Sequence, residues 1–290
     1  MHTHTETTQS TGQVARTSTA GTPDPSAIKG RMKATWEDGD YAIFATFMEP
    51  GAVEILNGWQ IPIGSRLLDI GCGAGQTAIP AAHQGMIVTG IDIADNLIEH
   101  AQERARYEGI SVRFDVGDAE ALPCDDNEFD VVISQIGAMF APDPDRVASE
   151  MARVCKPAGR LHMANWTPGS FAATMFKCVS RYTPPPVGVP SPVLWGVEDI
   201  VEQRLGENFT SFRLERKYYP SWKYPFDTKQ LVEFFRQHFG PVKRAFDALD
   251  DAGQKSLRAE LEAIYAAHNI ATDGTTQIRG EYLDVTATRE

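Results

Sequence analysis

The sequence is poor in cysteine, and the cysteines it has are not grouped. Four occur among 290 residues, at Cys72, Cys124, Cys155 and Cys178. They form neither a CxxC pair nor a cluster with histidine at metal-ligand spacing. We therefore expect reduced thiols and predict neither a metal site nor a disulfide framework.

Positive charge and long apolar runs are also scarce. The chain has 27 Lys and Arg against 39 Asp and Glu, a formal net charge of -12. No dense basic patch offsets this charge, so nucleic acid is not an expected partner. No apolar run approaches the length of a membrane span, and the first residues lack the order of a secretion signal. We expect a cytoplasmic protein, monomeric or homodimeric, that acts on a small molecule.

The two ends of the chain differ from its middle. Residues 1–26 contain almost no large apolar side chain and are predicted to be a disordered tail, which leaves 27–290 as a single domain. Aromatic and aliphatic residues return at helical spacing over 27–60, which predicts two or three short N-terminal helices that act as a lid. Insertions at about 166–206 and 226–271 are expected to form a helical cap.

Short apolar runs alternate with helical patterns in the middle of the chain. The helical patterns cover 95–107 and 146–155, and a further helix is expected near 198–205. This alternation predicts an α/β fold, with a parallel sheet and helices on both faces. The predicted strands are 66–70, 86–91, 112–116, 131–134, 161–164 and, later in the chain, 209–219 and 277–288.

A glycine-rich turn follows the first of these strands. Gly71, Gly73 and Gly75 permit positive φ and a close approach of the backbone to a ligand, and the helix after them begins with free N–H groups. The spacing is GxGxG, and Gln76 stands where the dinucleotide-binding turn has its third glycine. The turn therefore suits a nucleotide cofactor, although its spacing departs from the dinucleotide-binding pattern.

Acidic residues end the next two strands. Asp92 closes the second strand, at a distance from the glycines that suits the two hydroxyls of a ribose. Asp118 ends the third strand, where it can accept a hydrogen bond from an adenine amino group. A third acid, Asp69, lies two residues before the first glycine.

The stretch from about Lys33 to Asn165 resembles class I S-adenosylmethionine-dependent methyltransferases, and it is similar to the ubiquinone/menaquinone-biosynthesis-like members of that class. The motifs that carry the resemblance occur in the family's order and approximate spacing: DIGCGAGQ from position 69, GIDI from 90, GDAEALP from 117, FDVVIS from 129 and RVCKPAGRL from 153. The resemblance implies a Rossmann-like, mostly parallel seven-stranded sheet with its last strand antiparallel. It also implies S-adenosylmethionine as cofactor.

The resemblance further implies cofactor contacts, residue by residue. Asp92 would take the ribose hydroxyls, Ile93 would lie against the adenine, and Asp118 and Ala119 would read the adenine edge. Gln135 would face the cofactor or the acceptor, and Tyr41 would approach the amino-acid end from the lid, although packing alone explains Tyr41 equally well. The residues around the methionine part would be Asp69, Gly71, Cys72, Gly73, Gly75 and Gln76.

The acceptor site is less well marked. Methyl transfer is an in-line displacement for which positioning supplies most of the catalysis, and the sequence shows no catalytic motif. If a base is needed, the candidates are His162 and Asp143, although alternation also places His162 in the core. An apolar or aromatic acceptor would meet side chains of the lid, of the loop 137–140 and of the cap, although these also suit a packed core: Phe44, Met139, Phe140, Trp166 and Trp195.

Two other functions remain open at this point. A nicotinamide-dependent oxidoreductase would use a related sheet, but it calls for a GxGxxG turn and for a proton-relay group such as Tyr-x-x-x-Lys near the nicotinamide, and neither appears beside the glycine turn of this sequence. A sensor or partner subunit that binds S-adenosylmethionine without turnover would carry the same glycine turn and acids.

Overall fold

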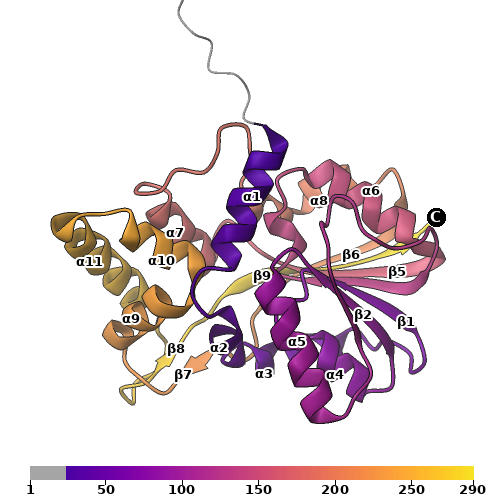
Figure 1. Ribbon diagram of the computed structural model, residues 1–290, viewed down its shortest axis with the longest axis horizontal. Coiled ribbons are helices and arrows are strands. Elements are labelled where there is room, and N and C mark those ends of the chain that lie inside the picture. Colours follow the sequence, from indigo (N-terminus) through magenta and orange to yellow (C-terminus); the bar gives the residue numbers. More distant parts are fainter. Residues whose placement is uncertain (1–23) are drawn as a thin grey trace, which may run out of the picture.

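A seven-stranded sheet runs through the middle of the protein, and helices pack around it (Figure 1). The computed structural model describes residues 24–290. Its strands are β1 (Arg66–Ile70), β2 (Ile87–Asp92), β3 (Arg113–Val116), β4 (Phe129–Gln135), β5 (Cys155–Trp166), β6 (Phe209–Tyr218), β7 (Lys223–Tyr224), β8 (Thr276–Gln277) and β9 (Glu281–Arg289).

The helices fall into a lid, a body and a cap. The α-helices are α1 (Pro25–Trp36), α2 (Tyr41–Thr46), α3 (Glu49–Gly58), α4 (Ala78–His83), α5 (Asp95–Glu108), α6 (Pro144–Val154), α7 (Phe171–Val179), α8 (Glu198–Leu205), α9 (Thr228–His238), α10 (Gly240–Asp247) and α11 (Asp251–His268). Two 3-10 turns are η1 (Ala138–Phe140) and η2 (Pro192–Gly196). Here "lid" means α1 to α3, and "cap" means α7 and α9 to α11.

The sheet has the strand order β3-β2-β1-β4-β5-β9-β6. Strands β1 to β5 pair in parallel, whereas β9 is antiparallel to both of its neighbours, β5 and β6. This topology confirms the predicted fold class, including the antiparallel last strand. Because β1 to β5 are parallel, their carboxyl ends meet at one edge of the sheet, and this edge faces α1 in Figure 1.

The predicted elements are present, with shifted ends. Most strands differ by one or two residues from their predicted bounds, and α5 ends before Gly109, which adopts the left-handed conformation (φ 68°) that a helix C-terminus favours. β5 is much longer than predicted, because Cys155 pairs with Phe129 and extends the strand backwards. The predicted helix therefore stops at Val154.

The ends of the chain also differ from prediction. α1 begins at Pro25, so the predicted tail, 1–26, ends two residues too late, and its first 23 residues lie outside the described part of the chain. The predicted strand 277–288 is split in two around Gly280. A Cβ atom there would lie 2.9 Å from the Trp166 ring, so the backbone passes too close to that ring for an ordinary strand residue.

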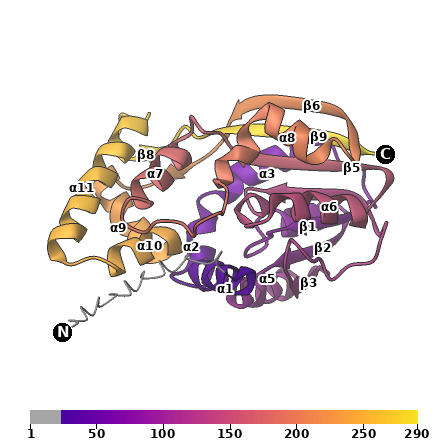
Figure 2. The ribbon, with the colours of Figure 1, turned by 90° about the horizontal axis from the view of Figure 1, so that it is seen from above.

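The cap has its own aromatic core. Phe171 and Phe235 pack against Tyr265, with ring centroids 5.3 and 5.1 Å apart, and all three side chains are fully buried. In Figure 2 the cap lies beside the sheet, and α1 runs between the cap and α5. The carboxyl ends of the parallel strands therefore face α1 and the cap.

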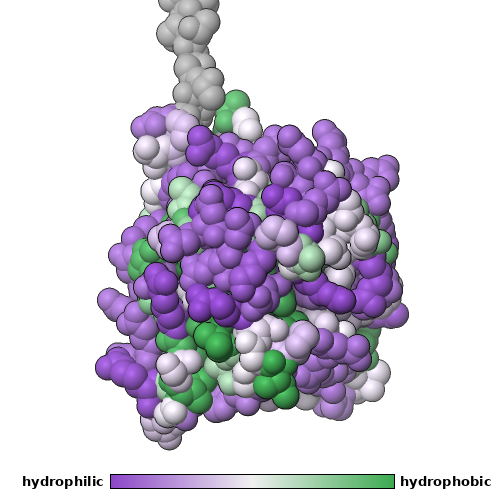
Figure 3. Space-filling model, turned by 90° about the vertical axis from the view of Figure 1, so that its right-hand side faces the viewer, coloured by the Kyte–Doolittle hydropathy of each residue, from purple (hydrophilic) through white to green (hydrophobic). Residues whose placement is uncertain are grey.

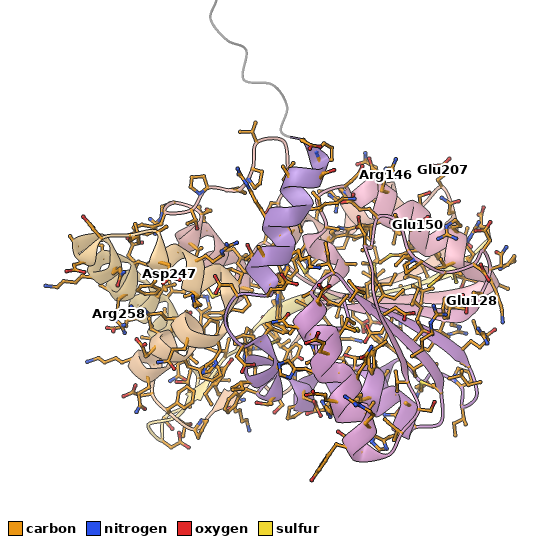
Figure 4. All side chains as sticks on the ribbon, viewed as in Figure 1. Glu128, Arg146, Glu150, Glu207, Asp247 and Arg258 are labelled. Carbon is orange, nitrogen blue, oxygen red and sulfur yellow. The ribbon has the colours of Figure 1, made fainter. Side chains whose placement is uncertain are left out.

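The outer surface carries most of the charge. The end of the molecule farthest from the cap is largely hydrophilic, with apolar groups gathered low on it (Figure 3). Charged side chains such as Glu128, Glu150 and Glu207 lie at the periphery of the body, and Asp247 and Arg258 lie on the cap (Figure 4). No helix within residues 24–290 is long and apolar enough to cross a bilayer.

Candidate functional site

A pocket lies at the carboxyl ends of β1 to β4, and α1 forms its outer wall. Three residues of α1, Lys29, Met32 and Trp36, line the pocket, and their spacing places them on one face of the helix. Nine of the predicted cofactor residues line the same pocket: Tyr41, Gly71, Gly73, Gln76, Asp92, Ile93, Asp118, Ala119 and Gln135.

The glycine turn after β1 forms the floor of the pocket. Gly71 and Gly73 have φ of 72° and 54°, a region that residues with a Cβ atom rarely adopt. A Cβ atom at Gly71 would lie 2.6 Å from the Cα of Gly137, in the loop after β4. Glycine at these positions therefore brings the loops after β1 and β4 into contact and leaves the backbone bare toward the pocket.

Asp92 links the end of β2 to this turn. One carboxylate oxygen, Oδ2, accepts a hydrogen bond from the Gly73 N–H at 2.9 Å, and the other accepts one from Ala94 at 3.0 Å. Burial raises the pKa of this carboxyl, and the backbone N–H donors act against that rise. Each oxygen keeps a second acceptor position, so Asp92 can still bind two hydroxyl groups.

Asp118, at the other end of the pocket, is held by a lysine from the lid. Its Oδ2 accepts a hydrogen bond from the Lys29 Nζ at 2.6 Å, and its Oδ1 accepts one from the Glu120 N–H at 2.9 Å. The same ammonium group lies 2.5 Å from Glu120. Asp118 therefore faces the pocket as a half-exposed acceptor in a fixed orientation.

Asp69 lies beneath the pocket and does not line it. The side chain is 1% exposed, and its Oδ2 has no hydrogen-bond partner among the described residues. Burial and the nearby Asp92 together raise its pKa to about 7, against the opposing effect of the hydrogen bond from the Ala78 N–H. With this pKa, the ionisation state of Asp69 changes near neutral pH.

Two other predicted cofactor residues also point away from the pocket. The Cys72 side chain is 2% exposed, and its sulfur would lie 3.0 Å from a Cβ atom at Gly90, so it faces the sheet. Gly75 faces the core, because a Cβ atom there would lie 2.9 Å from Ile79. Cys72 and Gly75 therefore shape the turn, and their spacing in the sequence is the same as it would be for residues that contact a ligand.

Gln135 is fixed at the end of β4. Its side-chain oxygen accepts a hydrogen bond from the Thr77 hydroxyl at 2.7 Å, and its amide donates to the Ala52 carbonyl at 3.3 Å. The Oε1 of Gln76 is buried without a hydrogen-bond partner in the described part of the chain, and Gln76 lines the pocket. Both amides are thus placed where a ligand's polar groups would lie.

Aromatic rings form the pocket wall toward the cap. Trp36 packs edge-on against Tyr41 and Phe140, with ring centroids 5.7 and 4.9 Å apart. The Tyr41 hydroxyl makes no hydrogen bond within residues 24–290. Burial, together with the nearby Asp92, raises the Tyr41 pKa, so its phenol stays protonated at neutral pH.

Most of the predicted acceptor contacts belong to the core. Phe140 lines the pocket, but Phe44 lies behind Tyr41, and Met139 is 1% exposed. Trp166 stacks on Trp222 at 5.3 Å, and Trp195 is 1% exposed beneath the Arg204 guanidinium. A buried aromatic of the core and one of a pocket have the same sequence signature.

Neither predicted base lies in the pocket. His162 is 1% exposed on β5, where it stacks on Trp59 with centroids 5.3 Å apart, and burial lowers its pKa to about 4. Asp143 caps α6 by accepting a hydrogen bond from the Arg146 N–H. The structure therefore corrects both assignments, because alternation along β5 turns His162 away from the pocket and Asp143 serves a helix end.

The ionisable residues of the lining are few, and one of them had no sequence signal. They are Lys29, Tyr41, Asp92 and Asp118. Lys29 and Met32 lie in a helix whose position over the sheet is set by tertiary packing. Their spacing in the sequence therefore gave no indication that they line the pocket. No group of three or more metal-ligating side chains occurs in residues 24–290.

These features fit an adenosyl sulfonium cofactor. Asp92 and Asp118 keep free acceptor positions at the two ends of one pocket, the bare glycine backbone lies between the strands, and the nearby carboxylates favour a cationic ligand. The aromatic wall lies on the remaining side, where an apolar group can pack.

Comparisons with known proteins point the same way. Residues 68–163 match the family described as a methyltransferase domain. An uncharacterized protein of Mycobacterium tuberculosis is 33% identical over 258 residues, which cover 88% of this chain and 93% of that protein.

Two further relatives have named activities. The ubiquinone biosynthesis O-methyltransferase of Coxiella burnetii is 34% identical over 98 residues, 34% of this chain and 42% of that protein. The structure of Haemonchus contortus phosphoethanolamine N-methyltransferase 2 in complex with S-adenosyl-L-methionine aligns with a TM-score of 0.52 and 21% identity. That alignment covers 82% of this chain and 52% of the other chain, and it shows a shared fold.

Proposed function

The chain belongs to the class I S-adenosylmethionine-dependent methyltransferases, and we propose that its acceptor is a small apolar or aromatic molecule bound against the Trp36, Tyr41 and Phe140 wall. When bound, S-adenosylmethionine supplies an electrophilic methyl group on a sulfonium sulfur, ready for in-line displacement by the acceptor. The observation that carries the acceptor proposal is the composition of this wall.

The cofactor contacts are proposed from the acceptor positions that remain free. Asp92 takes the two ribose hydroxyls, because each of its oxygens has one free position beside its backbone hydrogen bond. Asp118 accepts from the adenine amino group, while Ile93 and Ala119 pack on the ring. Gln76 and the glycine turn hold the amino-acid end.

The chain's own residues then act by positioning and by excluding water. No His, Glu or Cys lines the pocket within the described residues, and the pKa of Tyr41 is raised, so we propose no general base. The acceptor must therefore arrive in a nucleophilic form, such as a phenolate, an enolate, a thiolate or a neutral amine. The rings of Trp36 and Phe140 keep water from the reacting atoms and orient a flat acceptor.

The direct test is to measure S-adenosylhomocysteine formation with phenols, quinols, thiols, amines and fatty acids, and to identify the product by mass and fragmentation. We expect turnover with flat or apolar acceptors. Phe140→Ala should raise KM for such an acceptor more than it changes the affinity for cofactor. A chain that binds cofactor but is silent across the panel, or that prefers highly polar acceptors, would contradict the proposal.

A variant tests the cofactor assignment separately. Asp92→Ala should weaken S-adenosylmethionine binding by about 1–3 kcal/mol through two lost hydrogen bonds. Asp115→Asn is the matched control, because Asp115 lies on β3 in an ion pair with Arg113 and does not line the pocket. Calorimetry that gives equal affinities for both variants would contradict the role of Asp92.

A further inference from the structure

The ammonium group of Lys29 bridges two carboxylates at the adenine end of the pocket. It lies 2.6 Å from Asp118 Oδ2 and 2.5 Å from Glu120 Oε2. Lys29 itself belongs to α1 and lines the pocket, whereas the two acids belong to the loop after β3. This bridge therefore joins the lid to the group that faces the adenine position.

Glu120 makes this bridge more than a surface ion pair. Its side chain is 3% exposed, and its Oε1 accepts a hydrogen bond from the Asp143 N–H at 2.7 Å. Lys29 is the cation that pairs with it within residues 24–290. A buried carboxylate without a counter-charge is costly, and a second carboxylate two residues away would repel it. Removing the Lys29 charge would therefore push Asp118 and Glu120 apart.

The Asp118 carboxylate is held at both oxygens. Oδ1 accepts from the Glu120 N–H and Oδ2 accepts from Lys29, and each oxygen keeps one more acceptor position. Because both oxygens are anchored, the plane of the carboxylate is fixed, and so are the directions of its free positions. Lys29 therefore decides where Asp118 can accept a third hydrogen bond.

We propose that Lys29 is a positioning residue that determines the base specificity of the cofactor site: by bridging Asp118 and Glu120 it orients Asp118 toward an exocyclic amino group and joins that recognition to closure of α1. The inference rests on the proposed function, in which Asp118 accepts from the adenine amino group. It adds a residue of the lid to the recognition of the adenine amino group. It also means that adenine can be distinguished from other bases only when α1 is closed over the pocket.

Lys33 provides a matched comparison on the same helix. It lies one turn after Lys29, and its Nζ is 2.7 Å from Asp95 and 3.7 Å from Glu37. It also fastens α1 to the body, but it does not line the pocket and does not contact Asp118. A loss of lid closure alone would therefore affect Lys29 and Lys33 variants alike, whereas a loss of base recognition would affect only Lys29.

The experiment compares S-adenosylhomocysteine with S-inosylhomocysteine, in which a carbonyl oxygen replaces the amino group. Calorimetry on the full chain should give a clear preference for the adenosyl ligand. Lys29→Gln should weaken its binding about tenfold and remove most of the preference, because an oriented, charge-assisted acceptor is lost. Lys33→Gln should weaken both ligands equally and keep the preference, and Lys29→Arg should restore it in part.

Further variants separate the possible failures. If Lys29→Gln weakens both ligands equally, Lys29 only holds α1 against the body of the protein, and the inference is wrong. If Asp118→Asn removes the preference while Lys29→Gln keeps it, the inference fails and the assignment of Asp118 stands. If Asp118→Asn leaves the preference unchanged, both fail. Should Lys29→Gln unfold, Lys29→Met with Glu120→Gln removes the bridge without leaving a buried charge, and it should also lose the preference.

Discussion

Asp69 shows how a single buried carboxyl can make cofactor binding depend on pH. It is the last residue but one of β1, it makes no ion pair with a cation among residues 24–290, and its pKa is raised to about 7. An unfolded aspartate titrates near 3.9, so between these values the folded protein binds the extra proton. For the free protein, this stabilising contribution is present at low pH and is lost as pH rises through about 7.

Cofactor binding should instead favour the ionised form of Asp69. S-adenosylmethionine brings positive charge close to Asp69 and favours the ionised form, so its binding releases a proton. We expect the affinity to rise from pH 6 to pH 8, by about threefold to tenfold. Calorimetry in buffers of different ionisation enthalpy would measure the proton directly. In Asp69→Asn the rise should disappear, and an unchanged rise in that variant would contradict the assignment.

The predicted cofactor residues that line the pocket include those whose sequence signal is local. Asp92 is the last residue of β2 and Asp118 follows β3 by two residues, so a short stretch of sequence fixes their positions in the pocket. Lys29 was missed because its contacts with Asp118 and Glu120 lie about ninety positions away in the chain. No pattern near Lys29 distinguishes it from an ordinary lysine on the exposed face of a helix.

At the scale of elements, the lid and the cap are fastened to each other. Gly240, the first residue of α10, lies so close to α1 that a Cβ atom there would be 1.8 Å from the Thr35 carbonyl oxygen. The turn after α1 also pairs with the cap, because Asp38 contacts Lys243 at 3.0 Å and Arg244 at 3.3 Å. α1 and α10 should therefore move together.

Gly240→Ala tests this contact. The added methyl group must displace α1 or α10, so we expect a loss of about 1–3 kcal/mol in the free energy of unfolding, as in other overpacked sites. Cofactor affinity should fall as well, because α1 carries one wall of the pocket. Urea denaturation and calorimetry would measure both effects.

Gly30→Ala is the matched control on α1. A Cβ atom there meets nothing within 4 Å, and glycine is a poor helix former, so this change should stabilise the protein by about 0.5–1 kcal/mol. If both alanine variants had the same stability as the original chain, the lid and cap would not be coupled through Gly240.

Element types were easier to predict than element ends or partners. The helix predicted over 146–155 obscured the start of β5 at Cys155, because pairing with Phe129 outweighs local preference there. The strand 277–288 showed alternation throughout, but it breaks at Gly280 to pass Trp166. The aromatic residues predicted to meet the acceptor fit either a core or an acceptor site, and only the packing assigns Phe140 to the pocket and Trp195 to the core.

At the scale of the whole molecule, two parts of the protein, the sheet and the lid, line the pocket. The sheet supplies Asp92, Asp118 and the glycine turn, whereas the lid supplies Lys29 and Trp36 and is joined to the cap. A ligand that fills the pocket contacts both parts at once. Binding should therefore stabilise not only the residues it touches but also the attachment of lid and cap to the sheet.

Hydrogen exchange with and without S-adenosylhomocysteine would reveal this coupling. At about 100 times Kd the ligand should stabilise the folded protein by roughly 2.7 kcal/mol. Amides of the turn 71–76 and of α1 should gain protection, and so should those of α10, which contributes no residue to the pocket lining. NAD is the control and should protect none of them. Protection confined to the sheet edge would mean that α1 stays open over the bound ligand, and the lid would then have no part in holding the cofactor.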